Sequence, residues 1–255
     1  MTINKTEPTA RQIRLILALR KALIRDPRKI IKYQEAANLL HDDAALSSTP
    51  EELEDALKAD VRHRWELHLP QIFRPVWGVA RNDPADLPRF ISVRIRLRNL
   101  TGDHEISPVP DETRKRLTDL IREFDFVEFQ RFVALLFDEL GYFVRSYGMG
   151  YRHGTDVWVA ALQGGDIEEI IVEAKCSSLN ASEAAKQVQG YVKDHRAHRG
   201  IIAHNREVKA NQPGVELWDL NRIVAEMLNA RVGIYAAGEV DMGLFHDLCV
   251  NFSAS

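Results

Sequence analysis

The sequence predicts an α/β protein in which a mixed sheet flanked by helices follows a mainly helical N-terminal domain. In the second half of the chain, apolar runs of helical and strand period follow one another as helices, three strands, a helix, two strands and a helix. A strand meander followed by a crossover helix is typical of a mixed sheet. In the first half, three helical patterns precede one clear strand pattern.

The composition is that of an ordinary globular protein. Of its 255 residues, 45% are hydrophobic, which is enough for one large domain or two small ones. No segment approaches about 18 uninterrupted apolar residues, and no apolar run follows a basic N-terminus, so neither membrane spanning nor secretion is expected. The two cysteines, Cys176 and Cys249, lack metal-ligand spacing and indicate a reducing compartment, so we expect a cytoplasmic protein.

The charge is unevenly distributed along the chain. The net charge of −3 excludes a globally basic nucleic-acid coat protein. Residues 1–110 hold 18 Lys and Arg against 15 Asp and Glu, whereas the remainder holds 16 against 22. The acidic second half therefore favours a domain that gathers carboxylates around a cation over a purely electrostatic DNA binder.

Three helices are predicted in the N-terminal half. They cover residues 11–25, 29–41 and 50–69, and Thr49 and Glu52 form a capping-box pattern before the third.

One strand and a domain boundary follow these helices. Residues 89–98 alternate between apolar and polar side chains, which predicts a half-buried strand whose outer face carries Arg94 and Arg96. The turn-rich and proline-rich stretch 99–112 predicts a boundary. The predicted domains are therefore residues 1–110 and residues 111–255.

The C-terminal half has a regular order of elements. Apolar periodicity and capping residues predict helices at 113–124, 126–140, 181–195 and 220–230. Strand-like runs lie at 142–147, 156–162, 167–175, 200–204 and 215–218.

A pair of glycines between two of these strands predicts a hairpin. Two-residue hairpin turns need positive φ angles, which Gly164 and Gly165 adopt readily. With these glycines at the centre of the turn, Asp156 falls directly opposite Glu173. A slip of one residue would move Asp156 to the other face of the sheet.

Two carboxylates in opposed positions point to a bound cation. Directly opposed like charges repel, and a divalent cation between them would remove the repulsion. Lys175 lies two residues after Glu173, so it shares the same face, where an ammonium group can orient water or stabilise charge on a phosphate. A solvated Glu–Lys pair on a strand is the alternative. The apolar run Ile170–Val172 that leads into the pair favours metal-assisted phosphodiester hydrolysis.

The order of these motifs resembles a known family of nucleases. The segments, in order, are FVEFQRFVALLFDELGYFVRS, GTDVWV, IIVEAK, KQVQGY, GIIAHN and VELWDLNRIVAEM. Over about residues 113–230 the chain resembles the Mrr-like restriction endonucleases of the PD-(D/E)XK nuclease superfamily. The resemblance implies a restriction-endonuclease-like fold for the second domain.

The resemblance also implies roles for the matching residues. Asp156 would be the metal-binding aspartate, and Glu173 and Lys175 would be the two ends of the E-x-K element. The main-chain carbonyl of Ala174 would be a further metal ligand. The metal would be Mg²⁺ or Mn²⁺. The sequence departs from the pattern in one place, because no proline precedes Asp156.

Two further positions match the family but have structural alternatives. Glu128 matches an acidic residue of the first helix, yet Asp125 and Glu128 also form a capping-box pattern. Gln187 matches a glutamine of the helix after the E-x-K strand, but it could be a buried polar group or a boundary residue. Gln189 is the rival position for this role.

A few basic residues could touch a phosphate backbone. Arg152 and His153 follow a glycine-rich segment, for which a plain turn is the alternative. Arg94 and Arg96 lie on the basic strand face, for which a solvated edge strand is the alternative.

The function predicted from the sequence is that of a restriction-type or defence-type, Mg²⁺-dependent DNA endonuclease. The resemblance also implies a homodimer, and the N-terminal domain would recognise a target or a partner. Two alternatives stay open at this point. One is a non-catalytic nucleic-acid-binding module that kept the fold, and the other is a structure-selective nuclease such as a junction resolvase.

Overall fold

The computed structural model describes most of the chain. The described residues are 7–23, 30–41, 46–69, 72–76, 90–93, 109–148, 155–176, 180–208, 213–230, 232–234, 238–243 and 245. They form two units, which are described separately. The first unit comprises Met1–Arg96 and Leu162–Ile167, and the second comprises Leu97–Ala161 and Glu168–Ser255. The boundary predicted near residues 110 and 111 stays a prediction, because residues 94–108 lie outside the described ranges.

The first unit combines helices with a small sheet. Its helices are α1 (Ala10–Leu23), α2 (Tyr33–Leu39) and α3 (Pro50–Glu66). Its strands are β1 (Ile30–Lys32), β2 (Phe73–Val76) and β3 (Phe90–Val93), which pair antiparallel in the order β1-β3-β2. The capping box predicted for α3 is present, because the Thr49 hydroxyl accepts the Glu52 N–H and the Glu52 carboxylate accepts the Thr49 N–H.

One N-terminal prediction is wrong in part. The helix expected over 29–41 begins only at Tyr33, because Ile30–Lys32 form β1 instead. This strand pairs with β3, which lies about sixty residues further along the chain. A local periodicity cannot reveal such a partner, since strand pairing depends on residues far away in the sequence.

The second unit is built on a five-stranded mixed sheet of order β4-β5-β6-β7-β8. Its strands are β4 (Phe143–Tyr147), β5 (Val157–Gln163), β6 (Asp166–Lys175), β7 (Arg199–His204) and β8 (Glu216–Trp218). β4 pairs antiparallel with β5, whereas β6 pairs parallel with β7, and β7 pairs parallel with β8. This is the predicted meander followed by a crossover.

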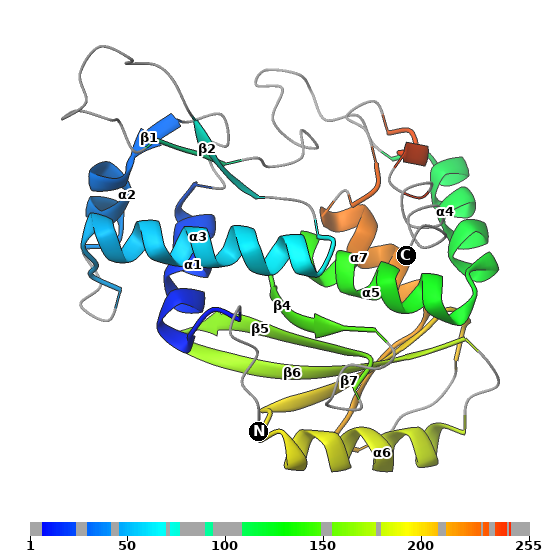
Figure 1. Ribbon diagram of the computed structural model, residues 1–255. Coiled ribbons are helices and arrows are strands. Elements are labelled where there is room, and N and C mark those ends of the chain that lie inside the picture. The colour runs from blue at the N-terminus through cyan, green and yellow to red at the C-terminus, as the bar shows by residue number, and fades with distance from the viewer. Residues whose placement is uncertain are drawn as a thin grey trace. The chain divides into compact units, whose positions relative to one another are not determined.

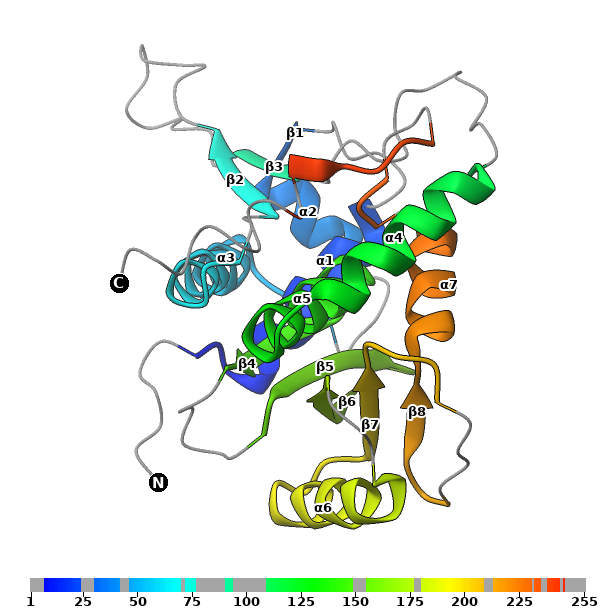
Figure 2. The ribbon, with the colours of Figure 1, turned by 90° about the vertical axis from the view of Figure 1, so that its right-hand side faces the viewer.

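The described part of this unit contains four helices. They are α4 (Asp111–Glu123), α5 (Phe126–Glu139), α6 (Ala181–Asp194) and α7 (Leu220–Ala230). Figure 2 shows α6 beneath the sheet and α4, α5 and α7 above it. In Figure 1, α6 runs from the end of β6 back towards the start of β7, as a parallel crossover requires. None of the helices in the described ranges is long and apolar enough to cross a membrane.

Helix α5 lies closest to the centre of the unit. Phe129, Phe132, Val133 and Leu136 of its apolar face are buried. The helix begins at a capping box in which the Asp125 carboxylate accepts the Glu128 N–H at 2.8 Å. Burial of the next turn places Gln130 inside the unit.

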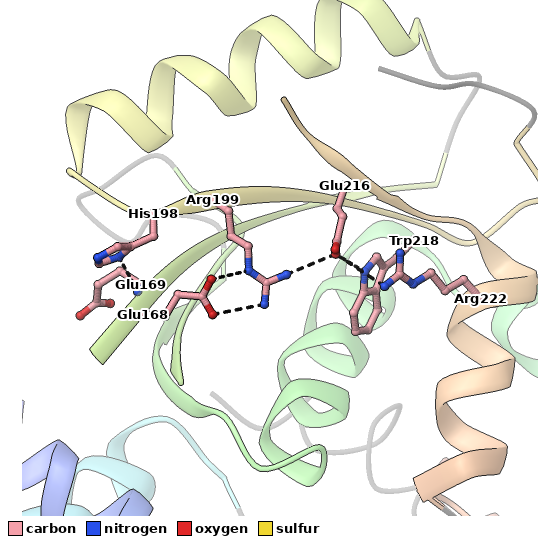
Figure 3. A network of polar contacts seen from close by, with 7 residues as sticks. All are labelled: Glu168, Glu169, His198, Arg199, Glu216, Trp218 and Arg222. Carbon is pink, nitrogen blue, oxygen red and sulfur yellow. Dashed lines mark hydrogen bonds and ion pairs between the residues drawn. The ribbon is translucent and has the colours of Figure 1, made fainter. Parts of the chain in front are cut away.

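A polar network ties the parallel strands together where they begin (Figure 3). The Arg199 guanidinium donates to the Glu168 carboxylate at 2.8 Å and to the Glu216 carboxylate at 3.3 Å. The Trp218 indole N–H donates to Glu216 at 2.8 Å, and the Arg222 guanidinium lies over the Trp218 ring. This network lies at the end of the strands opposite to Lys175 and His204, where β6 and β7 finish.

Candidate functional site

The β5–β6 hairpin has the turn that the sequence predicts. Gly164 and Gly165 separate the two strands, with φ angles of +57° and +93°. Positive φ at both central residues is the requirement of a type I′ turn. Asp156, immediately before β5, and Glu173, near the end of β6, therefore lie together at the open end of the hairpin.

The Asp156 carboxylate is tied to strand β6 beside Glu173. The main-chain N–H of Ala174 donates to Asp156 Oδ2 at 2.8 Å. This contact places the aspartate next to the residue that links Glu173 to Lys175. The three residues predicted from the sequence to form the site thus converge on one strand end.

A residue that the sequence interpretation missed holds the other aspartate oxygen. Gln130, on α5, is 2% exposed and donates from Nε2 to Asp156 Oδ1 at 2.6 Å. A glutamine within an apolar helix face was the available signal, because a buried amide needs a polar partner. The family resemblance instead points to Glu128, two residues earlier.

Glu173 is buried and only half satisfied. Glu173 is 4% exposed, and its Oε1 accepts a hydrogen bond from the Lys175 ammonium at 2.7 Å. Its second oxygen, Oε2, has no hydrogen-bond partner within the described part of the chain. An unsatisfied buried carboxylate oxygen is costly, and it calls for a further ligand.

Burial raises the pKa of both carboxyl groups. For Asp156, the loss of hydration outweighs the hydrogen bond from Ala174 and the attraction of Lys175. For Glu173, burial is again the main cause, and the neighbouring charge of Asp156 raises the pKa further. Lys175 and, to a smaller extent, the main chain of Asp156 oppose this shift, but they do not outweigh burial and the charge of Asp156.

The donor set fits a hard divalent cation. Mg²⁺ and Mn²⁺ prefer oxygen ligands, and Mg²⁺ commonly takes one or two carboxylates and keeps several waters. Glu173 Oε2 is available, and each Asp156 oxygen keeps a lone pair beside its present hydrogen bond. A cation there would also neutralise the charge repulsion that raises the pKa of Glu173.

The end of β6 is fastened to its surroundings by β7. In the parallel register Lys175 pairs with His204, and the Asn205 N–H donates to the Lys175 carbonyl at 3.2 Å. Asn205 is 1% exposed and its amide also donates to the Phe124 carbonyl at 3.4 Å. The Lys175 backbone is thereby held relative to the start of α5, which carries Gln130.

The next residue, Cys176, has no role as a nucleophile at neutral pH. Burial raises the pKa of its thiol to about 12, so the thiolate is scarce. The thiol donates to the Asp125 carbonyl at 3.7 Å, which is a packing contact between β6 and the start of α5.

Glu128 and Gln187, the two other predicted site residues, form contacts outside the Asp156–Glu173–Lys175 group. Glu128 accepts the Asp125 N–H at 2.9 Å, so its carboxylate completes the capping box of α5. Gln187 is exposed on α6, where its amide donates to the Tyr191 hydroxyl at 3.0 Å. Gln189, the rival position, donates to the Pro213 carbonyl at 3.0 Å. Catalytic roles for Glu128 and Gln187 stay predictions.

The four basic residues predicted to contact phosphates lie outside the described ranges. Arg152 and His153 belong to segment 151–154, and Arg94 and Arg96 belong to segment 94–108, both outside the described residues.

Solved structures that match this chain include three of restriction endonucleases. The DNA modification-dependent restriction endonuclease AspBHI shares 16% identity over 63% of this chain and 46% of that chain, with a TM-score of 0.38. Restriction endonuclease FokI shares 14% identity over 86% of this chain and 44% of its own, with a TM-score of 0.34. The structure of FokI bound to DNA shares 14% identity over 92% of this chain and 47% of that chain, with a TM-score of 0.33. This chain spans about half the length of these proteins.

A family model matches the region that contains the site. No curated protein matches the sequence. Residues 121–227 match the model Mrr_cat, whose description is restriction endonuclease. That range includes Gln130, Asp156, Glu173, Lys175 and Asn205. The segment from residue 121 to residue 227, somewhat less than half of the chain, is therefore similar to the restriction endonucleases that this family model describes.

Proposed function

We propose that this protein is a Mg²⁺-dependent endodeoxyribonuclease that hydrolyses phosphodiester bonds of DNA. The observation that carries the proposal is the convergence of Asp156, Glu173 and Lys175 at one end of the β5–β6 hairpin, with a buried Glu173 oxygen left open. Two carboxylates with raised pKa values beside one lysine suit a cation-binding hydrolytic site.

The carboxylates would hold the metal. Asp156 and Glu173 Oε2 supply hard oxygen ligands, and the Ala174 carbonyl is the further ligand that the family resemblance implies. When bound, the divalent cation would polarise the phosphate and lower the pKa of a coordinated water. Gln130 and the Ala174 N–H keep the Asp156 carboxylate in one orientation, as outer-shell partners of metal ligands commonly do.

Lys175 would act on the reacting phosphate. Its ammonium donates a hydrogen bond to Glu173 Oε1, and its side chain is 26% exposed, so the ammonium can reach both the site and solvent. In the reaction, a water oxygen bonds to phosphorus and the water gives up a proton to solvent, while one P–O ester bond breaks and the leaving oxygen takes up a proton. A lysine in this position can orient the water and stabilise the negative charge on the phosphate.

The experiment that tests the proposal is DNA cleavage with matched variants. Supercoiled and linear DNA are incubated with Mg²⁺, Mn²⁺ or EDTA, using wild type, Asp156→Ala and Lys175→Ala. Asp194→Ala and Lys193→Ala, two exposed positions at the end of α6, make the same exchanges away from the site. Thermal melting establishes that every variant is folded.

We expect metal-dependent cleavage that the Asp156 and Lys175 variants lose by about a hundredfold or more and that the two α6 variants keep. Cleavage that survives both site variants would refute the assignment. If no protein cuts, calorimetry with Mn²⁺ decides: heat that Asp156→Ala abolishes supports the metal site. Absence of binding would instead favour a non-catalytic module that kept the fold.

A further inference from the structure

The segment after β7 carries an exposed cation at the same end of the sheet as the site. Strands β6 and β7 are parallel, and Lys175 pairs with His204 in their register. Asn205 follows, and its N–H donates a hydrogen bond to the Lys175 carbonyl. Arg206 is the next residue. Neighbouring strands lie about 4.8 Å apart, so Arg206 emerges beside the end of β6 that carries Lys175.

The Arg206 backbone is held on both sides. Its N–H donates to His204 Nδ1 at 2.9 Å, and its carbonyl accepts the N–H of Leu220, the first residue of α7, at 3.1 Å. The residue before it, Asn205, is buried. Because the Arg206 backbone is already held in place, little main-chain freedom is lost when the side chain binds a ligand.

The guanidinium of Arg206, in contrast, has no partner among the described residues. The residue is exposed, and its side chain forms no ion pair or hydrogen bond with any residue that the structure describes. The acidic residue that follows, Glu207, is already paired with Arg122 of α4 at 2.8 Å. Arg206 therefore contributes a positive charge at this edge that no described residue pairs with.

The geometry points to Arg206 as a DNA-backbone contact that binds a phosphate next to the one that is cut. A guanidinium presents a planar set of donors that matches a phosphate, and it stays charged at every physiological pH. Lys175 is already engaged by Glu173, whereas Arg206 has its donors available. This role rests on the proposed nuclease function and adds a substrate-binding residue to it.

The test is the salt dependence of DNA binding. A labelled DNA duplex is titrated with protein in Ca²⁺, which takes similar oxygen ligands, over about 50 to 200 mM salt. Wild type is compared with Arg206→Gln and with Arg196→Gln. Arg196 is an exposed arginine after α6, at the opposite end of the sheet, so the same exchange is made away from the site.

For Arg206→Gln we expect weaker binding to all sequences alike and a slope of log K against log salt that is smaller by about one. Arg196→Gln should keep the wild-type slope. The rise in melting temperature caused by Mn²⁺ should be the same in all three proteins, because Arg206 is not a metal ligand.

Three results would overturn the inference. An unchanged slope in Arg206→Gln, with Asp156-dependent cleavage intact in wild type, refutes the phosphate contact and leaves the nuclease function standing. Equal losses in both arginine variants would mean a general charge effect. A wild-type protein that neither binds nor cuts any duplex would remove the contact and the proposed function together.

Discussion

Gln130 Nε2 lies 2.6 Å from Asp156 Oδ1, so a buried glutamine of α5 orients the aspartate that precedes β5. Both oxygens of this carboxylate accept hydrogen bonds, from Gln130 and from the Ala174 N–H. The contact joins two elements that lie 26 residues apart in the chain. It makes Gln130 a positioning residue for the proposed metal site.

Replacement of Gln130 by leucine should weaken Mn²⁺ binding by about tenfold to a hundredfold, because metal ligands depend on their outer-shell partners. Calorimetry measures the affinity. Gln130→Glu is the informative companion, since it places a third carboxylate beside Asp156. It should lower the melting temperature in EDTA and recover part of that loss in Mn²⁺. Wild-type Mn²⁺ affinity in the leucine variant would contradict the positioning role.

Glu173→Gln should abolish cleavage while leaving the metal-free protein as stable as wild type, or more stable. The exchange removes a buried negative charge next to Asp156 and keeps an oxygen for the Lys175 ammonium. Urea unfolding in EDTA measures the difference, which we expect to lie between zero and about 2 kcal/mol in favour of the variant. A clear loss of stability would show that Glu173 serves the fold.

The stability of the metal-free protein should fall as pH rises across the titration of the site. The ordinary pKa values of Asp156 and Glu173 are 3.8 and 4.5, and both are raised in the folded state. Between the ordinary and the raised values the folded state binds more protons than the unfolded chain, so the free energy of unfolding decreases with pH.

The measurement compares wild type with Asp156→Asn/Glu173→Gln by urea unfolding from about pH 4 upward. The stability difference should move in favour of the double variant as pH rises, and it should level off above the raised pKa values. Mn²⁺ binds the ionised carboxylates, so it should stabilise wild type more at high pH than at low pH. A difference that does not vary with pH would contradict the raised pKa values.

Arg199→Met should destabilise the protein by about 1 kcal/mol without changing the cleavage rate. The exchange leaves Glu168 and Glu216 without the cation that lies between them (Figure 3). The Arg199 side chain is only 30% exposed, so solvent replaces the lost pairing incompletely. Arg222→Met, at the more exposed end of the same network, should cost less. A changed cleavage rate in folded Arg199→Met would mean that the two ends of the sheet are coupled.

Gly200→Ala should destabilise the packing of α6 on β7 by about 1 to 3 kcal/mol. A Cβ atom at this glycine would clash with Val188 Cγ1 of α6, so one of the two elements must move. Gly190→Ala on the exposed face of α6 meets nothing within 4 Å and should stabilise the helix by roughly 0.5 to 1 kcal/mol.

The double variant Gly200→Ala/Val188→Ala tests the contact itself. Removal of the Val188 methyl groups makes room for the new Cβ atom, so the double variant should be less destabilised than the sum of the single variants. Thermal or urea unfolding supplies the four free energies of this cycle. Strict additivity would show that the loss in Gly200→Ala has another cause.

The sequence by itself determined the elements of the second unit, because their signals are local. The glycine pair required the hairpin turn, the Asp125–Glu128 box began α5, and the strands fell at their predicted places. The hairpin also brought Asp156 and Glu173 to one end, since a two-residue turn leaves a single register with the apolar faces aligned.

Only the tertiary structure decided which groups surround those carboxylates. Gln130 reaches Asp156, and Asn205 holds the Lys175 backbone, because α5 and β7 pack against β5 and β6 from distant parts of the chain. The strand Ile30–Lys32 likewise depends on β3, about sixty residues away. Such contacts are set by packing between elements, and helical or strand periodicity carries no record of them.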